Sequence, residues 1–341
     1  MIEPREPERT ILTGATTVAP QPTGPADTAE PTSVLLPGHD VPLGRYTTVR
    51  RLLPQRQRRM IGAWCFVDHF GPDDVAGRPG MQVPPHPHTG LQTVSWLIEG
   101  EILHRDSLGS LQTILPGQLN LMTAGHGIAH SEESPAAHPP SMHGLQLWVA
   151  LPDSARHGAA DFAHHPSVPG WREDGAEVSV VVGTLAGVTS PAVTYTPLVG
   201  AQITVDAGSG GRVGLPLEPD FEYAAVVMSG TARVAGAGLT PGDLLHLGRG
   251  RRELTVTTDT PDADGPTRLF LLGGEPFDEP LVMWWNFVGR SHEEIVAARD
   301  DWATGRRFGT VHGYAGDPLP APEMPTTRLK ARDRDGRTPG A

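Results

Sequence analysis

The sequence has almost no cysteine and no long hydrophobic run. Cys65 is the single cysteine among 341 residues, so an intrachain disulfide is excluded, which fits a reducing compartment. No run of about 18 apolar residues occurs, so no membrane-spanning helix is expected. The N-terminal stretch MIEPREPERTILTGATTVAP carries early acidic residues and lacks an apolar core. We therefore expect no secretory signal, and a cytoplasmic location.

Positive charge is also scarce, since the formal net charge is −12. An acidic chain has no general electrostatic attraction to nucleic acid or to an anionic membrane surface. The one dense basic stretch, residues 49–60, is typical of a solvated strand edge. We expect neither nucleic acid nor a membrane as a binding partner.

Glycine and proline are abundant, with 41 and 35 residues respectively. This composition favours many short strands joined by turns over long helices. The segment 91–105 is similar to the segment 222–236, and a Pro-Gly turn follows in each half, at Pro116 and at Pro241. Such a repeat predicts two related β-barrels or sandwiches in tandem.

One helix is expected after the second repeat. Ser291 and Glu294 have the spacing of a capping box, in which the serine side chain caps the first turn. Ile295, Ala298 and Trp302 follow at i, i+3 and i+7, which places them on one apolar stripe. The pattern predicts a surface helix that packs on a barrel.

The expected organisation has five parts. Both ends are rich in proline and polar residues without a hydrophobic period, which is typical of disorder. The parts are a disordered segment at 1–40, a first barrel at 41–165, a second barrel at 166–290, a helix with its extension at 291–316, and a disordered tail at 317–341.

Two pairs of polar residues indicate a metal site. His86 and His88 are i and i+2 in a strand-like segment, and His130 and Glu132 repeat that spacing after the Pro-Gly turn. On an extended strand this spacing puts both side chains on one face, where imidazoles can bind a metal ion at about 2.1 Å. Three imidazoles and one carboxylate suit Fe(II), and also Mn, Ni, Cu or Zn. The alternative is that all four are hydrogen-bonded polar residues of the core or turns.

Other histidines and aromatic residues are given structural roles. His126 precedes His130 by four residues, but the glycines beside it argue against a helix that would align the two rings. His104 and His143 are interpreted as hydrogen-bonded strand residues, while Trp148 and Phe66 are interpreted as core or pocket wall. Cys65 is expected to be buried. We expect the pocket to be lined by Trp96, Leu121 and Met122.

The segment PPHPHTGLQTVSWLIEGEILHRDSLG, followed by PGQLNLMTAGHGIAHSE, resembles the pirin family, whose members are bicupins of the cupin superfamily. The resemblance is specific over residues 45–150 and looser beyond. It implies an all-β fold of two tandem cupin (jelly-roll-like) barrels with a C-terminal helix, tied together by the N-terminal strand region and that helix. It also implies one iron ion bound by His86, His88, His130 and Glu132.

The second barrel departs from this pattern. At the positions that match the four expected ligands it has Pro216, Glu218, Thr255 and Thr257, so we expect it to bind no metal. Gln92 stands where many pirins carry glutamate, which we expect to remove a negative charge near the metal.

The resemblance implies one of two functions. The first is a quercetinase-like dioxygenase acting with O₂ on a flavonol or another enolisable aromatic compound, in which Glu132 moves a proton. The second is a redox-sensing protein that binds a transcription factor or a metabolic enzyme without catalysis. A zinc-dependent isomerase or hydrolase is a weaker third alternative. The expected assembly is a monomer.

Overall fold

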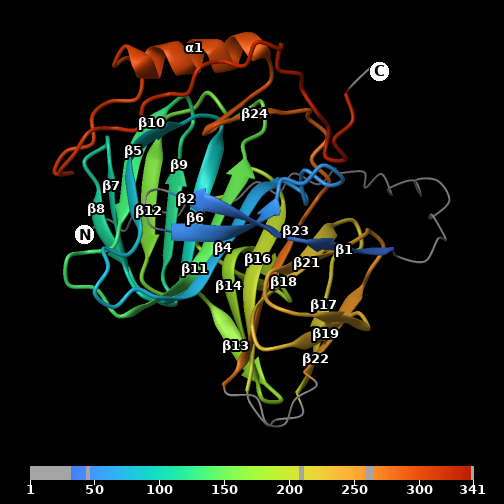
Figure 1. The fold of residues 1–341 in the computed structure, drawn as a ribbon. Coiled ribbons are helices and arrows are strands. Elements are labelled where there is room, and N and C mark those ends of the chain that lie inside the picture. The colour runs from blue at the N-terminus through green and yellow to red at the C-terminus, as the bar shows by residue number, and fades with distance from the viewer. Residues whose placement is uncertain (1–31, 44–46, 207–210, 259–264, 339–341) are drawn as a thin grey trace, which may run out of the picture. The chain divides into compact units, whose positions relative to one another are not determined.

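The computed structural model describes residues 32–43, 47–206, 211–258 and 265–338. Within them strands are the main regular structure, every pair of named strands is antiparallel, and the one α-helix comes after the strands (Figure 1). The all-β fold of two tandem barrels with a C-terminal helix is thus confirmed. No helix in these ranges is both long enough and apolar enough to cross a bilayer.

The first barrel consists of a seven-stranded sheet and a four-stranded sheet. The larger sheet has the spatial order β12 (Asp161–His165), β9 (Leu119–Thr123), β6 (Leu91–Glu99), β11 (Ser141–Ala150), β4 (Trp64–Asp74), β3 (Thr47–Leu53) and β2 (His39–Leu43). The smaller sheet has the order β5 (Gln82–His88), β10 (Ile128–Glu133), β7 (Ile102–Asp106) and β8 (Leu111–Ile114).

The second barrel repeats this arrangement. Its larger sheet has the order β1 (Ser33–Pro37), β21 (Asp243–Leu247), β18 (Glu222–Ser229), β23 (Thr267–Gly274), β16 (Leu198–Val205), β14 (Ala176–Leu185) and β13 (Gly170–Glu173), with β15 (Val188–Thr189) also paired to β14. Its smaller sheet has the order β17 (Arg212–Pro216), β22 (Glu253–Thr257), β19 (Ala232–Val234) and β20 (Ala237–Leu239).

The internal repeat of the sequence corresponds to equivalent strands. β6 pairs with β9 and β11 in the first barrel, as β18 pairs with β21 and β23 in the second. Gly100 and Gly230 end β6 and β18 with φ angles of 89° and 73°, which glycine adopts without a Cβ clash. At the sheet edge, β1 lies beside β21 as β12 lies beside β9. A strand from before the first barrel therefore completes the second.

The two barrels pack through their larger sheets. Trp64 of β4 is fully buried, and its indole Nε1 donates to the backbone carbonyls of Val199 and Gly273, at 3.1 and 3.2 Å. Gly200 allows this approach, because a Cβ there would lie 2.9 Å from the Trp64 ring. Cys65 beside it is buried, as expected, and burial raises the pKa of its thiol to about 12. That thiol is therefore inert near neutral pH.

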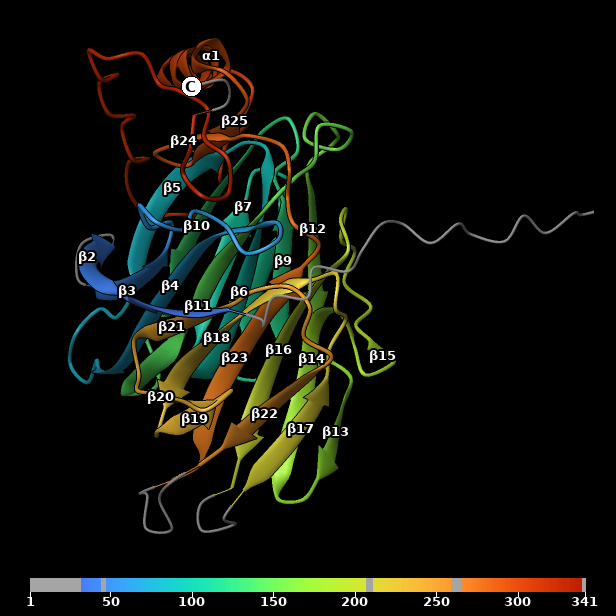
Figure 2. The same ribbon diagram turned by 90° about the vertical axis from the view of Figure 1, so that its right-hand side faces the viewer.

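The C-terminal segment returns to the first barrel. β24 (Val282–Trp284) and β25 (Phe287–Gly289) form a hairpin that leads into α1 (His292–Ala303) (Figure 2). The predicted N-cap is confirmed, since the Ser291 side chain accepts from the Glu294 backbone N–H at 3.2 Å. Ile295 and Ala298 are buried. Figure 2 shows this segment at the same end of the first barrel as β5.

The prediction of disorder at both ends is wrong for the residues that the structure describes. Residues 33–37 form β1 and residue 39 begins β2, while residues 1–31 lie outside the described ranges. Residues 317–338 pack along the barrel: the Leu319 N–H donates to the Pro85 carbonyl, and Leu281 and Arg332 exchange backbone hydrogen bonds. These segments are held by backbone pairing, which a search for hydrophobic periodicity does not detect.

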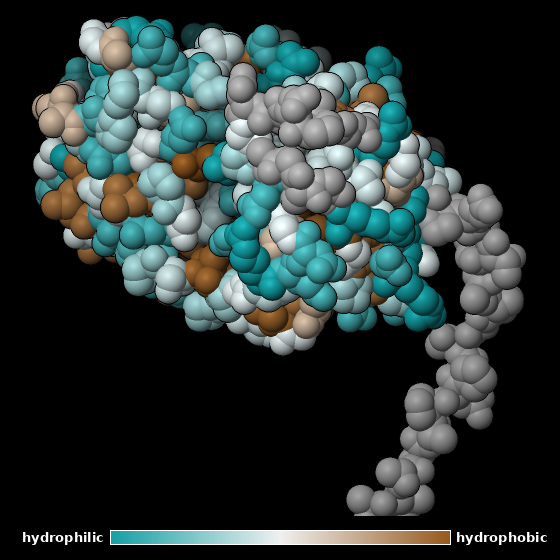
Figure 3. All heavy atoms as spheres, turned by 90° about the horizontal axis from the view of Figure 1, so that it is seen from below, coloured by the Kyte–Doolittle hydropathy of each residue, from teal (hydrophilic) through white to brown (hydrophobic). Residues whose placement is uncertain are grey.

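The surface seen from below in Figure 3 is mixed in character. Hydrophobic side chains occur on this face in small separate groups among polar ones. Several arginines of the basic stretch at 49–60 are paired rather than free: Arg50 with Asp40, and Arg51 with Asp68. The stretch therefore offers less positive charge to an outside partner than its sequence suggests.

Candidate metal centre

Three neighbouring strands of the smaller sheet each place a pair of polar side chains, two residues apart, inside the first barrel. All six side chains are buried, and they are His86 and His88 on β5, His130 and Glu132 on β10, and His104 and Asp106 on β7. The strand register sets His130 opposite His86 on one side and opposite Asp106 on the other, with Glu132 opposite His104. Side chains opposite each other on one face are close neighbours.

The prolines around the first histidine pair suit the position of β5. This strand lies at the edge of its sheet, where a proline without an N–H removes no hydrogen bond from the ladder. The register between β10 and β5 shifts between His130 and Glu132, which is a β-bulge opposite Pro84 and Pro85. Bulges change the direction of side chains next to functional sites.

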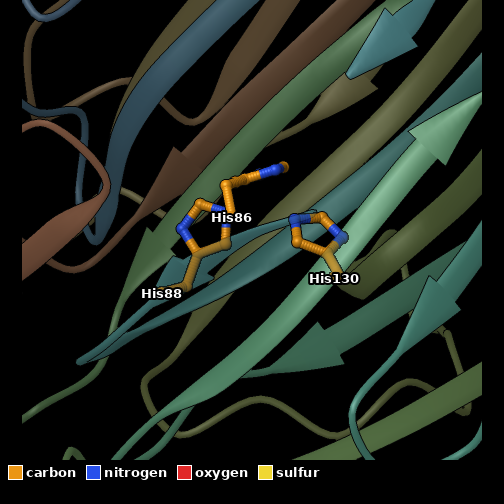
Figure 4. Close-up of side chains that lie close together, drawn as sticks. All are labelled: His86, His88 and His130. Atoms are coloured by element: carbon orange, nitrogen blue, oxygen red, sulfur yellow. The ribbon is translucent and has the colours of Figure 1, made fainter. Parts of the chain in front are cut away.

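The rings of His86, His88 and His130 face one another (Figure 4). Their centroids lie 4.4 to 4.9 Å apart, and one nitrogen from each lies within 4.8 Å of the other two. Three atoms with this spacing share a point no more than about 2.8 Å from each, against about 2.1 Å for a zinc–nitrogen bond. A small inward movement would complete three metal bonds.

The hydrogen bonds of the rings show which nitrogen of each is free to bind a metal ion, and so test whether the residues fit one. His86 Nδ1 lies 2.9 Å from the Pro84 carbonyl oxygen, and His88 Nδ1 lies 3.1 Å from that of Asn286. A carbonyl accepts only, so each Nδ1 carries the proton and each Nε2 presents a lone pair. His130 Nε2 is buried and has no hydrogen-bond partner in the protein. The donor set therefore fits a transition-metal ion.

Glu132 is fixed from the opposite sheet. Its two carboxylate oxygens accept from Ser95 Oγ of β6 at 3.0 Å and from Gln146 Nε2 of β11 at 3.3 Å. A carboxylate oxygen of Glu132 lies within 4.8 Å of nitrogens of His130 and His104 rather than in the cluster of His86 and His88. The structure therefore gathers three of the four expected ligands directly, and places the fourth beside His130 in the same barrel interior.

Burial sets the protonation of the site. It lowers the pKa of His86 to about 4 and lowers the pKa values of His88 and His130 well below the ordinary range. The imidazoles are therefore neutral near pH 7, which is the form that binds metal. Burial raises the pKa of Glu132, while the hydrogen bonds from Ser95 and Gln146 act in the opposite direction.

A cavity of about 380 Å³ opens beside the histidines. His86, His88 and Glu132 contribute to its lining, and aromatic side chains form part of its wall: Phe66, Trp148 and Trp285. The Phe66 and Trp148 rings are stacked with centroids 3.9 Å apart, and the Trp148 ring meets the His88 ring edge to face at 5.1 Å. The wall is therefore continuous with the histidine cluster.

The expected lining of the pocket was wrong. Trp96, Leu121 and Met122 are buried in the hydrophobic core, and the Trp96 indole N–H donates to Gln202 Oε1. Leu121 and Met122 are neighbours on β9 and point to opposite faces of the sheet, and both faces are buried, so hydrophobic character does not tell which face meets the cavity. Gln92 does not line the cavity either; its amide donates to Thr123 Oγ1 and the Val193 carbonyl. The expected electrostatic effect of Gln92 on the metal therefore loses its structural basis.

Of the remaining histidines considered from the sequence, two lie away from the metal-binding cluster and one lies beside it. His126 lies away from both clusters of metal-binding side chains, in a small hollow beside α1, with its ring 6.1 Å from that of His157. His143 Nε2 lies 2.9 Å from His69 Nε2 in the larger sheet. His104, interpreted from the sequence as an ordinary strand residue, lies against His130. Its spacing from Asp106 repeats that of the other two pairs, and that repetition was the signal available in the sequence.

Comparisons with known proteins agree with this geometry. Residues 46–149 match the model of the family described as pirin, and residues 201–309 match that of the pirin C-terminal cupin domain. A Pseudomonas aeruginosa protein named "Putative quercetin 2,3-dioxygenase" is 48% identical over 284 residues, which cover 83% of this chain and 88% of that protein. A "Pirin-like protein" of Caulobacter vibrioides is 37% identical over 267 residues, or 76% of this chain and 88% of that one. A crystal structure titled quercetin 2,3-dioxygenase, from Acinetobacter baumannii, matches with a TM-score of 0.81 and 42% identity, covering 88% of this chain and 97% of that chain.

Proposed function

This chain belongs to the pirin family, and we propose on that premise that it is a metal-dependent dioxygenase acting on a flavonol or another enolisable aromatic compound. One observation carries the proposal. One nitrogen from each of His86, His88 and His130 lies within 4.8 Å of the other two, and His86 and His88 line a cavity whose wall includes three aromatic side chains. The similarity to proteins named as quercetin dioxygenases supports the same substrate class.

We propose His86, His88, His130 and Glu132 as the metal ligands, with Fe(II) as the metal. Mixed nitrogen and oxygen ligation of this kind also suits Mn, Ni, Cu and Zn, and all of these compete for the site. The other barrel has no comparable histidine pair among its described residues, so one ion per chain is proposed.

When bound, the metal ion supplies Lewis acidity, which lowers the pKa of a substrate hydroxyl. Glu132 is proposed to hold the proton that this hydroxyl loses. In the metal-free site burial raises the pKa of its carboxyl group, and a bound cation would act in the opposite direction. Ser95 and Gln146 hold the carboxylate in place, and an oxygen free of the metal is required for the proton.

The cavity suits a flat aromatic molecule. Its volume of about 380 Å³ lies in the range of small-molecule pockets. Phe66 and Trp148, which are stacked on each other, form part of its wall, and Trp285 reaches the cavity from the hairpin of β24 and β25. Arg51 also lines the cavity, with its guanidinium 4.4 Å from the centroid of the Phe66 ring. Asp68, which binds the Arg51 guanidinium through both carboxylate oxygens, lines the cavity too, so a bound ring with several oxygens would meet aromatic surface and an ion pair.

The test combines metal analysis with oxygen uptake. Protein purified anaerobically is analysed for metal, loaded with Fe(II), and assayed with quercetin and other enolisable aromatics in an oxygen electrode. We expect O₂ uptake that His88→Ala abolishes together with metal binding. His126→Ala is the matched control, since it removes a histidine outside both clusters, and it should retain both properties. Metal-loaded protein that consumes no O₂ with any of these compounds would overturn the dioxygenase proposal.

The second candidate is a redox-sensing protein that binds a transcription factor or a metabolic enzyme. The relative named "Pirin-like protein", which is 37% identical, has a name that states no activity, so that relative does not favour catalysis over this role. In that case the metal would change oxidation state without turnover of a small molecule. The oxygen electrode separates the two candidates, since only a dioxygenase consumes O₂ in proportion to substrate. Under either proposal the chain acts as a cytoplasmic monomer.

A further inference from the structure

The third polar pair of the barrel interior, His104 and Asp106, lies directly behind His130. His104 Nε2 is 3.1 Å from Asp106 Oδ2, and His104 Nδ1 is 3.4 Å from His130 Nδ1. The exposed fractions of the three residues are 2%, 1% and 0%. The His104 ring is also stacked on the ring of Phe162, at 4.3 Å with 14° between the planes. These contacts leave the ring little freedom to turn.

The direction of the hydrogen bonds can be worked out from Asp106. Its Oδ1 accepts from the backbone N–H groups of Leu108 and Ser110, both at 2.9 Å, and its Oδ2 faces His104. A carboxylate only accepts, so the His104 proton lies on Nε2 and its Nδ1 is an acceptor. His130 Nδ1 must then donate to it, which leaves His130 Nε2 with a free lone pair.

We propose that Asp106 and His104 are positioning residues, forming a hydrogen-bond relay that fixes His130 with its proton on Nδ1 and its Nε2 lone pair toward His86 and His88. The proposal rests on the metal site proposed above. It explains why His130 Nε2 is buried without a protein partner. Fixing the tautomer and direction of a ligating histidine from behind is a recognised determinant of metal affinity.

The relay provides the hydrogen-bond acceptor at Nδ1 of His130, which backbone carbonyls provide for the other two rings. Carbonyl oxygens of Pro84 and Asn286 accept at the Nδ1 atoms of His86 and His88. His130 is held instead by side chains, so its tautomer alone can be changed by substitution without altering the main chain. The relay is therefore a testable element of the site.

Asp106→Asn reverses the relay by a defined route. The backbone N–H groups of Leu108 and Ser110 require an acceptor, so the asparagine Oδ1 stays with them and its NH₂ faces His104 Nε2. His104 must then accept at Nε2 and donate from Nδ1, which makes His130 Nδ1 an acceptor and moves the His130 proton to Nε2. A proton at Nε2 must be lost before a metal can bind there.

The experiment uses the full chain, with two readouts. In metal-free protein, ¹⁵N-detected NMR of the histidine rings should show His130 as the Nδ1–H tautomer in the unmodified chain and as Nε2–H in Asp106→Asn. In Zn(II) titrations against a competing chelator, Asp106→Asn should bind about 10- to 100-fold more weakly. Asp74→Asn is the matched control, because Asp74 also accepts from a backbone N–H, that of Ala76, but it is exposed. It should change neither readout.

His104→Phe is the second variant, since it keeps a flat ring against Phe162 but removes the acceptor behind His130. We expect partial loss of Zn(II) affinity and a mixture of His130 tautomers. An unchanged His130 tautomer in Asp106→Asn would overturn the relay. A second result would also overturn it: Asp106→Asn binds Zn(II) as tightly as the unmodified chain, while His104→Phe loses Zn(II) binding as completely as His88→Ala. His104 would then be a metal ligand and not a positioning residue. Absence of Zn(II) binding by the unmodified chain would instead count against the proposed metal site, and the tautomer readout would still decide the relay.

Discussion

Ser95 is the residue whose role in the site can be tested most sharply. It lies on β6 of the larger sheet, is buried, and donates from Oγ to Glu132 Oε1 at 3.0 Å. Ser95→Ala removes that donor and leaves a space of one oxygen atom. Ser131→Ala is an unusually close control: Ser131 is also buried, lies beside Glu132 in the chain, and its Oγ has no hydrogen-bond partner.

The expected magnitude follows from the character of the bond. A hydrogen bond to a charged group contributes about 1.5–3 kcal/mol, which corresponds to about 10- to 150-fold in a binding constant. Without Ser95, burial of Glu132 is less compensated, so the pKa of its carboxyl group moves further upward. Only the carboxylate binds metal, so protons compete more strongly as the pH falls. The loss of affinity should therefore be larger at pH 6 than at pH 8.

The assay is a competitive titration of Zn(II) or Co(II) against a chelator at both pH values, with urea denaturation of the metal-free proteins as the check on folding. Ser95→Ala should bind more weakly, with the difference widening toward pH 6. Ser131→Ala should match the unmodified chain, because it removes a hydroxyl that makes no bond. Equal affinities for the two variants at both pH values would show that Glu132 is not held by Ser95 when the metal is bound, or that it is not a ligand.

Three further outcomes are expected. Burial lowers the pKa of His69 to about 3, below its value of about 6.5 in the unfolded chain. The free energy of unfolding is therefore highest above about pH 6.5 and falls as the pH decreases, by about 3 kcal/mol at pH 4.5. His69→Leu should flatten the pH profile of urea denaturation, and an unchanged profile would contradict this. Elemental analysis should give one metal ion per chain, and a reproducible value near two would show that the second barrel also binds. Trp285→Ala should raise the KM for a flavonol several-fold at unchanged metal content, because Trp285 lines the cavity while the Asn286 carbonyl still accepts from His88; an unchanged KM would remove Trp285 from the substrate wall.

The local part of the site could be predicted from the sequence. Residues two apart on a strand share a face whatever the tertiary structure, so the pairing of His86 with His88 and of His130 with Glu132 needed only the strand assignment. The tandem barrels followed from a repeat whose glycines, Gly100 and Gly230, both take a left-handed backbone conformation. Both features depend on the local backbone conformation, which the residue types of a short segment indicate.

The long-range part could not be predicted. His104 and Asp106 have the same spacing as the other pairs, but their importance depends on β7 lying beside β10, which is a matter of register between distant segments. Ser95 and Gln146 reach Glu132 from the opposite sheet, and only the closure of the barrel brings them there. The terminal segments dock through backbone hydrogen bonds, which any residue except proline can donate, and through scattered side-chain contacts.

The metal centre depends on three separate parts of the chain, although the ligands come from one sheet. The ring of His86 is fixed by its own strand at Pro84, and the ring of His130 by the neighbouring strand β7. The ring of His88 is fixed by Asn286, which follows the second barrel in the sequence. The second barrel, which we propose to bind no metal, thus carries the chain back to the site, because β25 can reach β5 only after β23 has completed the second sheet. Binding of metal favours the conformation in which all three contacts are made, so it stabilises the C-terminal hairpin as well as the histidines.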